Sequence, residues 1–344
     1  MASLSSIADS FSDDVIRADA RLECVICSAT AVALYEDLSD RFFGAPGRWN
    51  FLRCSNPQCA VLWLNPMPLE SDIWKAYRNY YTHDVPGEAE GASASRGFTA
   101  DARQAIKRAY IATHLGYPDR EINMRDRMLA ILAYLDPTRR ADTDFPLKHL
   151  PRETRGRMLD LGCGSGELLG RMRALGWRAE GIDVDPAAVA VARRRGFKAK
   201  IGSLHEQKFP AASFDAVVMS HVIEHVHHPL ELLKEVRRIL KPGRRLVIAT
   251  PNARSLGHRM LGSRWPFLDP PRHLQVFTPR ALKSLVLAAG FDDVRVSTEI
   301  RTAAAMLPLI YASRIVGRVV EYGENFALHF DRDAGEEIAL IALR

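Results

Sequence analysis

Residues 158–169 read MLDLGCGSGELL, and this stretch decides the fold class of the chain. An apolar run of the kind found in buried strands leads into three glycines at alternate positions, Gly162, Gly164 and Gly166. Glycines at such positions let the backbone turn sharply and let a ligand approach it closely. A helical pattern begins at Glu167, so the stretch predicts a strand, a ligand-binding turn and a helix in succession.

The sequence around this stretch repeats the alternation of strand and helix. Alternating elements of this kind indicate an α/β fold, a parallel sheet with helices on both faces. Such sheets bind ligands at the carboxyl ends of their strands. Strands are expected at residues 157–161, 179–184, 197–201, 214–219, 245–249, 294–298 and 338–343, and intervening helices at 167–175, 186–195 and 229–240.

Two carboxylates lie close to the glycine turn in the sequence, and they indicate what kind of ligand binds there. Asp183 ends the second expected strand, where an acid can accept hydrogen bonds from ribose hydroxyls. A dinucleotide would be the obvious ligand, but its fingerprint is G-x-G-x-x-G, and the glycines here are spaced G-x-G-x-G. Asp160 precedes the turn and would repel a pyrophosphate, whereas it suits a cationic amino-acid group and a sulfonium.

The string at residues 159–166 resembles motif I of the class I S-adenosylmethionine-dependent methyltransferases. The runs at 214–226, 240–243 and 249–252 are similar to the rest of that family's core, so the resemblance covers about residues 155–299. It implies a Rossmann-like, seven-stranded sheet, S-adenosylmethionine as cofactor and methyl transfer as the activity. Carried over position by position, it implies these cofactor-binding residues: Asp160, Gly162, Gly164, Gly166, Asp183, Val184, Ser203, Leu204 and Ser220.

Four of the five cysteines form two close pairs near the start of the chain. Cys24 and Cys27 make the first pair, and Cys54 and Cys59 make the second. Two thiol pairs separated by a short loop are the usual ligand set of a tetrahedral, structural zinc ion. We therefore expect a zinc ribbon over residues 21–68.

The remaining chain divides around this module. We expect a leader at residues 1–20, a helical or lid region with a linker at 69–152, and a methyltransferase domain at 153–344. Within the lid region, residues 70–82 predict a helix that carries Tyr77 and Tyr81. The region resembles that of zinc-ribbon relatives such as sugar C-methyltransferases, which implies that Tyr81 contacts the cofactor or substrate. Packing in the core is the alternative.

Side chains suited to the chemistry gather after the fourth expected strand. His221, Glu224 and His225 follow it directly, and His273 comes later in the chain. One of the three histidines could act as a general base on the acceptor. Small-RNA 2′-O-methyltransferases and ubiquinone-pathway O-methyltransferases resemble this chain in their Glu-His pair, which implies a second, divalent ion as another interpretation. A structural hydrogen-bond network is the third.

Composition excludes several classes of protein. The 344 residues are 47% apolar and 26% charged, with a net charge of +6 that is spread along the chain, so nucleic acid is not favoured as a partner. No secretory signal or membrane span is expected, which predicts a cytoplasmic protein.

We expect a methyltransferase for a small-molecule acceptor, a sugar or tailored metabolite, at oxygen or carbon. An RNA or protein methyltransferase and a non-catalytic binding module are the alternatives, and a dimer stays open.

Overall fold

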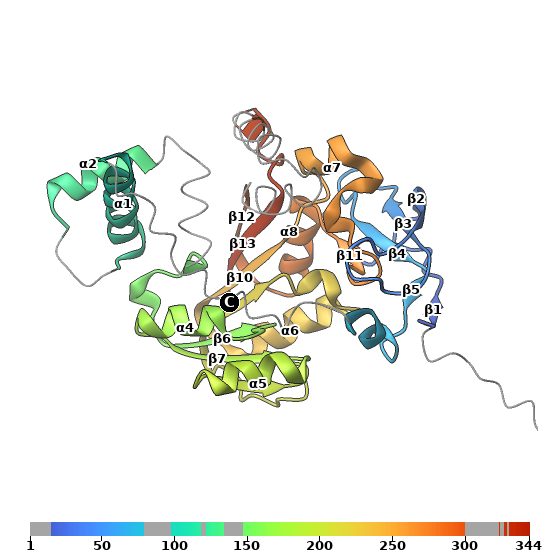
Figure 1. Cartoon of the computed structure of the whole chain (residues 1–344), viewed down its shortest axis with the longest axis horizontal. Coiled ribbons are helices and arrows are strands. Elements are labelled where there is room, and N and C mark those ends of the chain that lie inside the picture. The colour runs from blue at the N-terminus through green and yellow to red at the C-terminus, as the bar shows by residue number, and fades with distance from the viewer. Residues whose placement is uncertain are drawn as a thin grey trace, which may run out of the picture.

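The computed structural model describes residues 15–78, 98–117, 122–133, 147–299, 323, 327–328 and 330–344. Figure 1 shows the N-terminal strands on one side of a central sheet and helices α1 and α2 on the other. Tyr81, which was expected at the cofactor, lies outside the described residues. None of the described helices is long and apolar enough to cross a membrane.

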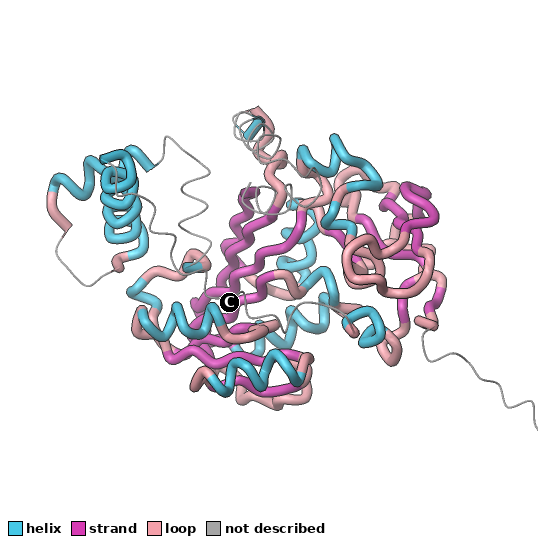
Figure 2. Tube along the Cα trace, in the orientation of Figure 1, coloured by secondary structure: helices cyan, strands magenta, loops and turns pink. Residues whose placement is uncertain are grey.

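A seven-stranded sheet forms the centre of the molecule (Figure 2). Its strand order is β12-β13-β10-β9-β6-β7-β8, and β13 alone among these strands runs antiparallel to its neighbours. The prediction of a Rossmann-like, seven-stranded sheet is confirmed. The strands are β6 (Arg157–Leu161), β7 (Arg178–Asp183), β8 (Lys198–Ile201), β9 (Phe214–Ser220), β10 (Leu240–Pro251), β12 (Asp292–Glu299) and β13 (Glu337–Leu343).

Helices cover both faces of this sheet because alternate strand residues point to opposite sides. Met158 of β6 packs with α4 and α5, whereas the next residue, Leu159, packs with α6 and α8. Capping residues fix where three of these helices begin: Asp185 accepts from the Ala187 N–H at 2.9 Å, Ser255 from that of His258 at 3.0 Å and Thr278 from that of Ala281 at 3.1 Å. The helices are α4 (Glu167–Ala174), α5 (Pro186–Arg194), α6 (Pro229–Ile239), α7 (Leu256–Leu261) and α8 (Pro279–Ala288).

The N-terminal module forms a second sheet of four strands. Three come from the module itself, β2 (Ala31–Leu38), β3 (Trp49–Cys54) and β4 (Leu62–Asn65), and the fourth, β11 (Gln275–Val276), comes from the part of the chain that forms the seven-stranded sheet. A short ladder of β1 (Ala18–Asp19) with β5 (Met67–Pro68) lies beside it. Cys24 and Trp63 share one apolar core with α6 and α8, so the module is built into the larger domain.

The region between the module and the sheet differs from expectation at one helix. Residues 70–82 were expected to be helical, but the described part is only a 3-10 helix at Ile73–Tyr77. The helices α1 (Phe98–Tyr110), extended by a π turn at Ile111–Leu115, and α2 (Met124–Ala133) lie within the region 69–152 that was expected to be helical. Two short 3-10 turns, Arg152–Thr154 and Ile223–His225, flank the sheet, and two more follow α7 at Gly262–Arg264 and Pro266–Leu268.

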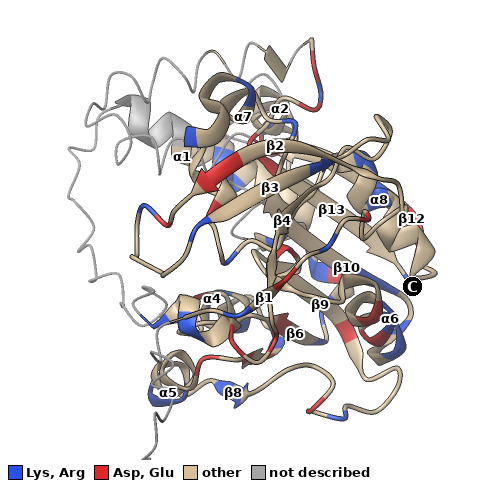
Figure 3. Cartoon of the chain, turned by 90° about the vertical axis from the view of Figure 1, so that its right-hand side faces the viewer, with Lys and Arg blue, Asp and Glu red and all other residues tan. Residues whose placement is uncertain are grey.

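Charges are mixed on the helices that face solvent. Figure 3 shows basic and acidic segments alternating along α6. They pair within the helix, Lys234 with Glu231 at 2.9 Å and Arg238 with Glu235 at 2.7 Å. Exposed pairs of this kind contribute little to stability, so the positive net charge here belongs to an ordinary solvated surface.

Candidate active site

The glycine turn after β6 adopts the conformation that its sequence predicts. Gly162, Gly164 and Gly166 have φ angles of 71°, 51° and 82°, values that favour glycine. The Gly164 N–H donates to Asp183 Oδ2 at 2.8 Å, and the Asp185 N–H donates to Oδ1 at 2.9 Å. Asp183 is therefore held rigidly at the end of β7, beside the turn.

The surroundings of this turn fit a cationic ligand. Asp160 is 3% exposed, and its burial raises the pKa of the carboxyl group to about 8, against the opposing charge of Lys148. A cation placed next to such a carboxyl group favours its ionised form. A Cβ added at Gly164 would meet no described atom within 4 Å, so space adjoins the backbone there. These two features suit the amino-acid end of S-adenosylmethionine.

The other expected cofactor residues lie around the same edge in different surroundings. Val184, next to Asp183, is an apolar side chain that is 74% exposed, so a bound ligand could pack against it. Ser203 is exposed and donates to Glu206, whereas Leu204 is buried in the core. Ser220, at the end of β9, accepts a hydrogen bond from Lys148 Nζ at 2.9 Å.

The segment after β9 joins the glycine turn to the expected catalytic residues. A Cβ added at Gly162 would lie 2.6 Å from Val222 Cγ2, so the residues that follow Ser220 pack directly against the turn. Asn252 at the end of β10 and Glu337 at the start of β13 lie at the same edge, because β13 runs antiparallel. The edge thus has one half formed by β6, β7 and β8 and another formed by β9, β10, β13 and β12.

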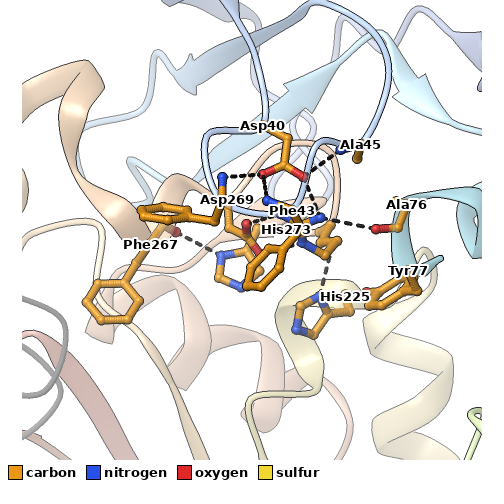
Figure 4. A network of polar contacts seen from close by, with 11 residues as sticks. Asp40, Phe43, Ala45, Ala76, Tyr77, His225, Phe267, Asp269 and His273 are labelled. Atoms are coloured by element: carbon orange, nitrogen blue, oxygen red, sulfur yellow. Dashed lines mark hydrogen bonds and ion pairs between the residues drawn. The ribbon is translucent and has the colours of Figure 1, made fainter. Parts of the chain in front are cut away.

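Two histidines face each other in the second half of this edge. The rings of His225 and His273 lie 4.7 Å apart, centre to centre, and Figure 4 shows both within one polar network. His225 Nδ1 lies 2.9 Å from the Arg272 carbonyl oxygen, and His273 Nδ1 lies 2.8 Å from that of Phe267. A carbonyl only accepts, so each Nδ1 carries a proton and each Nε2 points away from these backbone partners.

Glu224 completes this group. Its Oε2 accepts from the Thr250 hydroxyl at 2.8 Å, and its Oε1 has no hydrogen-bond partner among the described residues. One ligand atom each from Glu224, His225 and His273 lies within 4.8 Å of the others. A carboxylate oxygen and two imidazole nitrogens suit a divalent transition metal, so these residues fit the ion suggested by the sequence.

His221 lies in a different electrostatic setting from the other two histidines. Its Nδ1 is 3.3 Å from Glu224 Oε1 without hydrogen-bond geometry, and its Nε2 is 3.1 Å from Glu337 Oε1. Burial alone would lower its pKa, but Glu337 and Glu224 together raise the pKa of His221 to about 10. Burial beside His273 instead lowers the pKa of His225 to about 4. At neutral pH His221 is thus a cation, and His225 is neutral.

Three residues of this site were not found by reasoning from the sequence. Tyr77 Oη lies 3.0 Å from His225 Nδ1, Glu337 pairs with His221, and Lys148 bonds Ser220. Tyr77 was placed on the expected helix at 70–82 without a role in the site, and an acid directly before the apolar run of β13 was a signal for Glu337. Lys148 precedes the first strand of the sheet and has no motif around it.

The four paired cysteines meet at one point of the N-terminal module. Cys24 and Cys59 have their Sγ atoms 3.7 Å apart, those of Cys27 and Cys54 are 3.5 Å apart, and all four lie within 4.8 Å of one another. Tetrahedral zinc with Zn–S bonds of about 2.3 Å places sulfur atoms about 3.8 Å apart. The hydrogen bond from Cys59 lowers the pKa of Cys24 to about 5. The cluster therefore fits a four-thiolate zinc ion.

Comparison with known proteins points in one direction. Residues 132–296 match a family model described as a methyltransferase domain. The chain is similar to the ubiquinone biosynthesis O-methyltransferase of Cereibacter sphaeroides, with 33% identity over 150 residues, 40% of this chain and 61% of that protein. The protein of the same name from Xanthomonas oryzae pv. oryzae is 36% identical over 103 residues, 28% of this chain and 43% of its own length.

These matches span less than two thirds of either relative. Among solved structures, an S-adenosylmethionine-dependent methyltransferase from Archaeoglobus fulgidus covers 60% of this chain and 91% of its own, with a TM-score of 0.45 and 24% identity.

Proposed function

We propose, from the premise that residues 132–296 form a class I S-adenosylmethionine-dependent methyltransferase domain, that this chain methylates a hydroxyl group of a small molecule. One observation carries the proposal: Glu224, His225 and His273 bring a carboxylate oxygen and two imidazole nitrogens within 4.8 Å of one another, and Val222 of the same 221–225 segment packs against the glycine turn. The names of the two relatives support oxygen as the acceptor atom.

The first half of the edge binds the methyl donor in this proposal. When bound, S-adenosylmethionine supplies a methyl group activated by its sulfonium. Asp183 would accept hydrogen bonds from the ribose hydroxyls, the ionised Asp160 would pair with the amino group, and Val184 would pack against the adenine. Gly164 leaves the room that the amino-acid end needs.

The second half orients and deprotonates the acceptor. We assign the base to His273, whose Nδ1–H is fixed by the Phe267 carbonyl so that Nε2 faces the acceptor hydroxyl. Burial lowers the pKa of His225 to about 4, so this ring takes up a proton less readily than an ordinary imidazole, and we assign it to the wall of the acceptor site rather than to proton transfer. His221 was among the expected bases, but a protonated ring has no lone pair to offer. We therefore propose that it fixes Glu224 and Glu337.

A divalent ion is the alternative use of the same atoms. Glu224 Oε1 and the Nε2 atoms of His225 and His273 would hold it, and it would polarise the acceptor hydroxyl there. Zinc has a separate, structural place in the proposal, at Cys24, Cys27, Cys54 and Cys59.

The test is a cofactor-turnover assay with purified protein against phenols, sugar nucleotides and RNA, with and without added divalent ions. Methylation of a phenol or sugar hydroxyl is the expected outcome, and metal analysis is expected to find one zinc per chain. Calorimetry provides the matching binding measurement. Absence of affinity for both S-adenosylmethionine and its demethylated product would refute the proposal, and methylation of RNA alone would replace its acceptor.

A further inference from the structure

Arg272 lies wholly inside the protein, behind the two histidines. Its side chain is 0% exposed, and it pairs with two carboxylates: Nη1 is 2.8 Å from Asp40 Oδ2, and Nε is 2.9 Å from Asp269 Oδ2. Nη1 also donates to the Ala76 carbonyl at 3.1 Å, and the guanidinium stacks 4.7 Å from the Phe43 ring. Figure 4 shows this network connecting the N-terminal module to the loop that bears His273.

In the N-terminal module, backbone hydrogen bonds fix the position of Asp40. Asp40 follows β2, and its carboxylate accepts from the backbone N–H groups of Phe42 at 2.9 Å, Phe43 at 3.1 Å and Ala45 at 2.8 Å. Burial alone would raise the pKa of Asp40, but Arg272 and these N–H groups hold it below its usual value. Asp40 is thus a fixed, ionised anchor rather than a mobile surface acid.

The backbone of the same arginine reaches the histidines. Its carbonyl oxygen receives the Nδ1–H of His225, and its N–H donates to the Asp269 carbonyl at 2.9 Å. The His273 N–H donates to that carbonyl too, at 3.1 Å. One tight turn therefore orients His225 directly and carries His273, and the Arg272 side chain fixes where that turn lies.

A buried ion pair is a poor way to gain stability, because taking two charges from water offsets much of their attraction. Apolar residues of equal volume could fill the same space. Asp40 and Arg272 come from segments 232 positions apart, and what their pairing specifies is the position of one turn against another.

We propose that Arg272 and Asp40 are positioning residues, through which the cysteine-containing module sets the orientation of the His225 and His273 rings. This inference rests on the proposed function for its kinetic consequence but not for its structural one. The module then does more than cover the site: it aligns the groups that act on the acceptor.

The test compares Asp40→Asn with Asp37→Asn in the full chain. Asp40→Asn removes one charge and keeps the shape, while Asp269 still pairs with Arg272. Asp37 lies in the same module, 75% exposed and 3.5 Å from Arg48, which is also exposed, so its variant is the matched control. Arg272→Lys is the second variant, because lysine lacks the planar fork that joins two carboxylates.

Two measurements decide the matter. A misplacement of about 1 Å costs about 100-fold in rate, so kcat should fall about 10- to 100-fold in Asp40→Asn, with the KM for S-adenosylmethionine unchanged. Two-bond proton–nitrogen spectra of histidine-labelled protein should show altered ring signals for His225 and His273, assigned with His225→Gln and His273→Gln. Asp37→Asn should change neither.

Unaltered ring signals in Asp40→Asn would overturn the inference, whatever the activity. Altered signals with an unchanged kcat would overturn its kinetic part. The spectra need no acceptor, so a wild-type protein without turnover would refute the proposed function and leave the positioning claim to be decided by the spectra.

Discussion

The two halves of the sheet edge are built in different ways. The half formed by β6, β7 and β8, which is the cofactor half of the proposal, contains Asp160, the three glycines and Asp183 within 24 consecutive residues. Its hydrogen bonds are local, such as the bond from the Gly164 N–H to Asp183. The half formed by β9, β10, β13 and β12, which is the acceptor half of the proposal, combines residues from distant parts of the chain. They are Tyr77, the 221–225 segment, the 267–273 loop and Glu337. One half is a local motif, and the other exists only in the folded protein.

This difference separates what is general from what is particular in the molecule. A short turn with two carboxylates can bind the same nucleoside in many proteins without reference to the rest of the chain. The acceptor half depends on contacts between the N-terminal module and the sheet, where this chain can differ from others of the same fold. A variant in one half should therefore leave the function of the other half unchanged.

The largest effect is expected in the acceptor half, from His273→Gln. Glutamine can still donate to the Phe267 carbonyl but offers no basic nitrogen, so kcat should fall about 100- to 10,000-fold. The calorimetric Kd for S-adenosylmethionine should not change, because no cofactor group contacts this side chain in the proposal. His205→Gln, at an exposed histidine of the cofactor half, is the control and should leave kcat intact.

A variant that kept full activity would remove His273 from the chemistry. A variant that lost cofactor affinity as well would show that the two halves are not independent.

In the cofactor half, a change at Asp160 is expected to alter the Kd for S-adenosylmethionine rather than kcat. Its pKa of about 8 means that the free protein carries this proton at pH 7, and pairing with the amino group of the cofactor expels it. Binding then releases a proton, so a rise in pH favours the complex, and Kd should fall about tenfold from pH 6 to pH 7.

Calorimetry in buffers of different ionisation enthalpy measures the released proton directly. Asp160→Asn should bind more weakly and flatten the pH dependence, while kcat at saturating cofactor changes little. A wild-type Kd that stayed constant from pH 6 to pH 7 would contradict the assignment.

The sequence predicted the strands and the glycine turn of the cofactor half because local rules determine them. The alternation of apolar runs gave all seven strands of the sheet, and the glycine spacing located the turn between β6 and α4. The cysteine pairs likewise predicted that four thiols would meet. In each case the residues involved are neighbours in the chain or are joined by a short hairpin, so their spacing carries the information.

The acceptor half could be predicted only in part. His221, Glu224, His225 and His273 were expected together, but their roles depend on partners that no spacing reveals. Glu337 makes His221 a cation, and two backbone carbonyls choose the tautomers of the other rings. Likewise, the fourth strand of the cysteine module, β11, comes from residues more than 200 positions further on.

The smallest effect is expected where the two regions join, at Thr278. Its hydroxyl donates to the Cys59 carbonyl at 2.7 Å and accepts from the Ala281 N–H at 3.1 Å, so one side chain links the cysteine module to the start of α8. Thr278→Val keeps the shape and removes both bonds, which should lower the free energy of unfolding by about 1–2 kcal/mol. Denaturant unfolding measures this loss, and Thr278→Ser, which keeps the hydroxyl, should restore most of it. Because Thr278 touches neither half of the edge, kcat and the Kd for the cofactor should stay at their wild-type values. A fall in kcat would mean that this junction, in addition to Arg272, determines where the histidines lie.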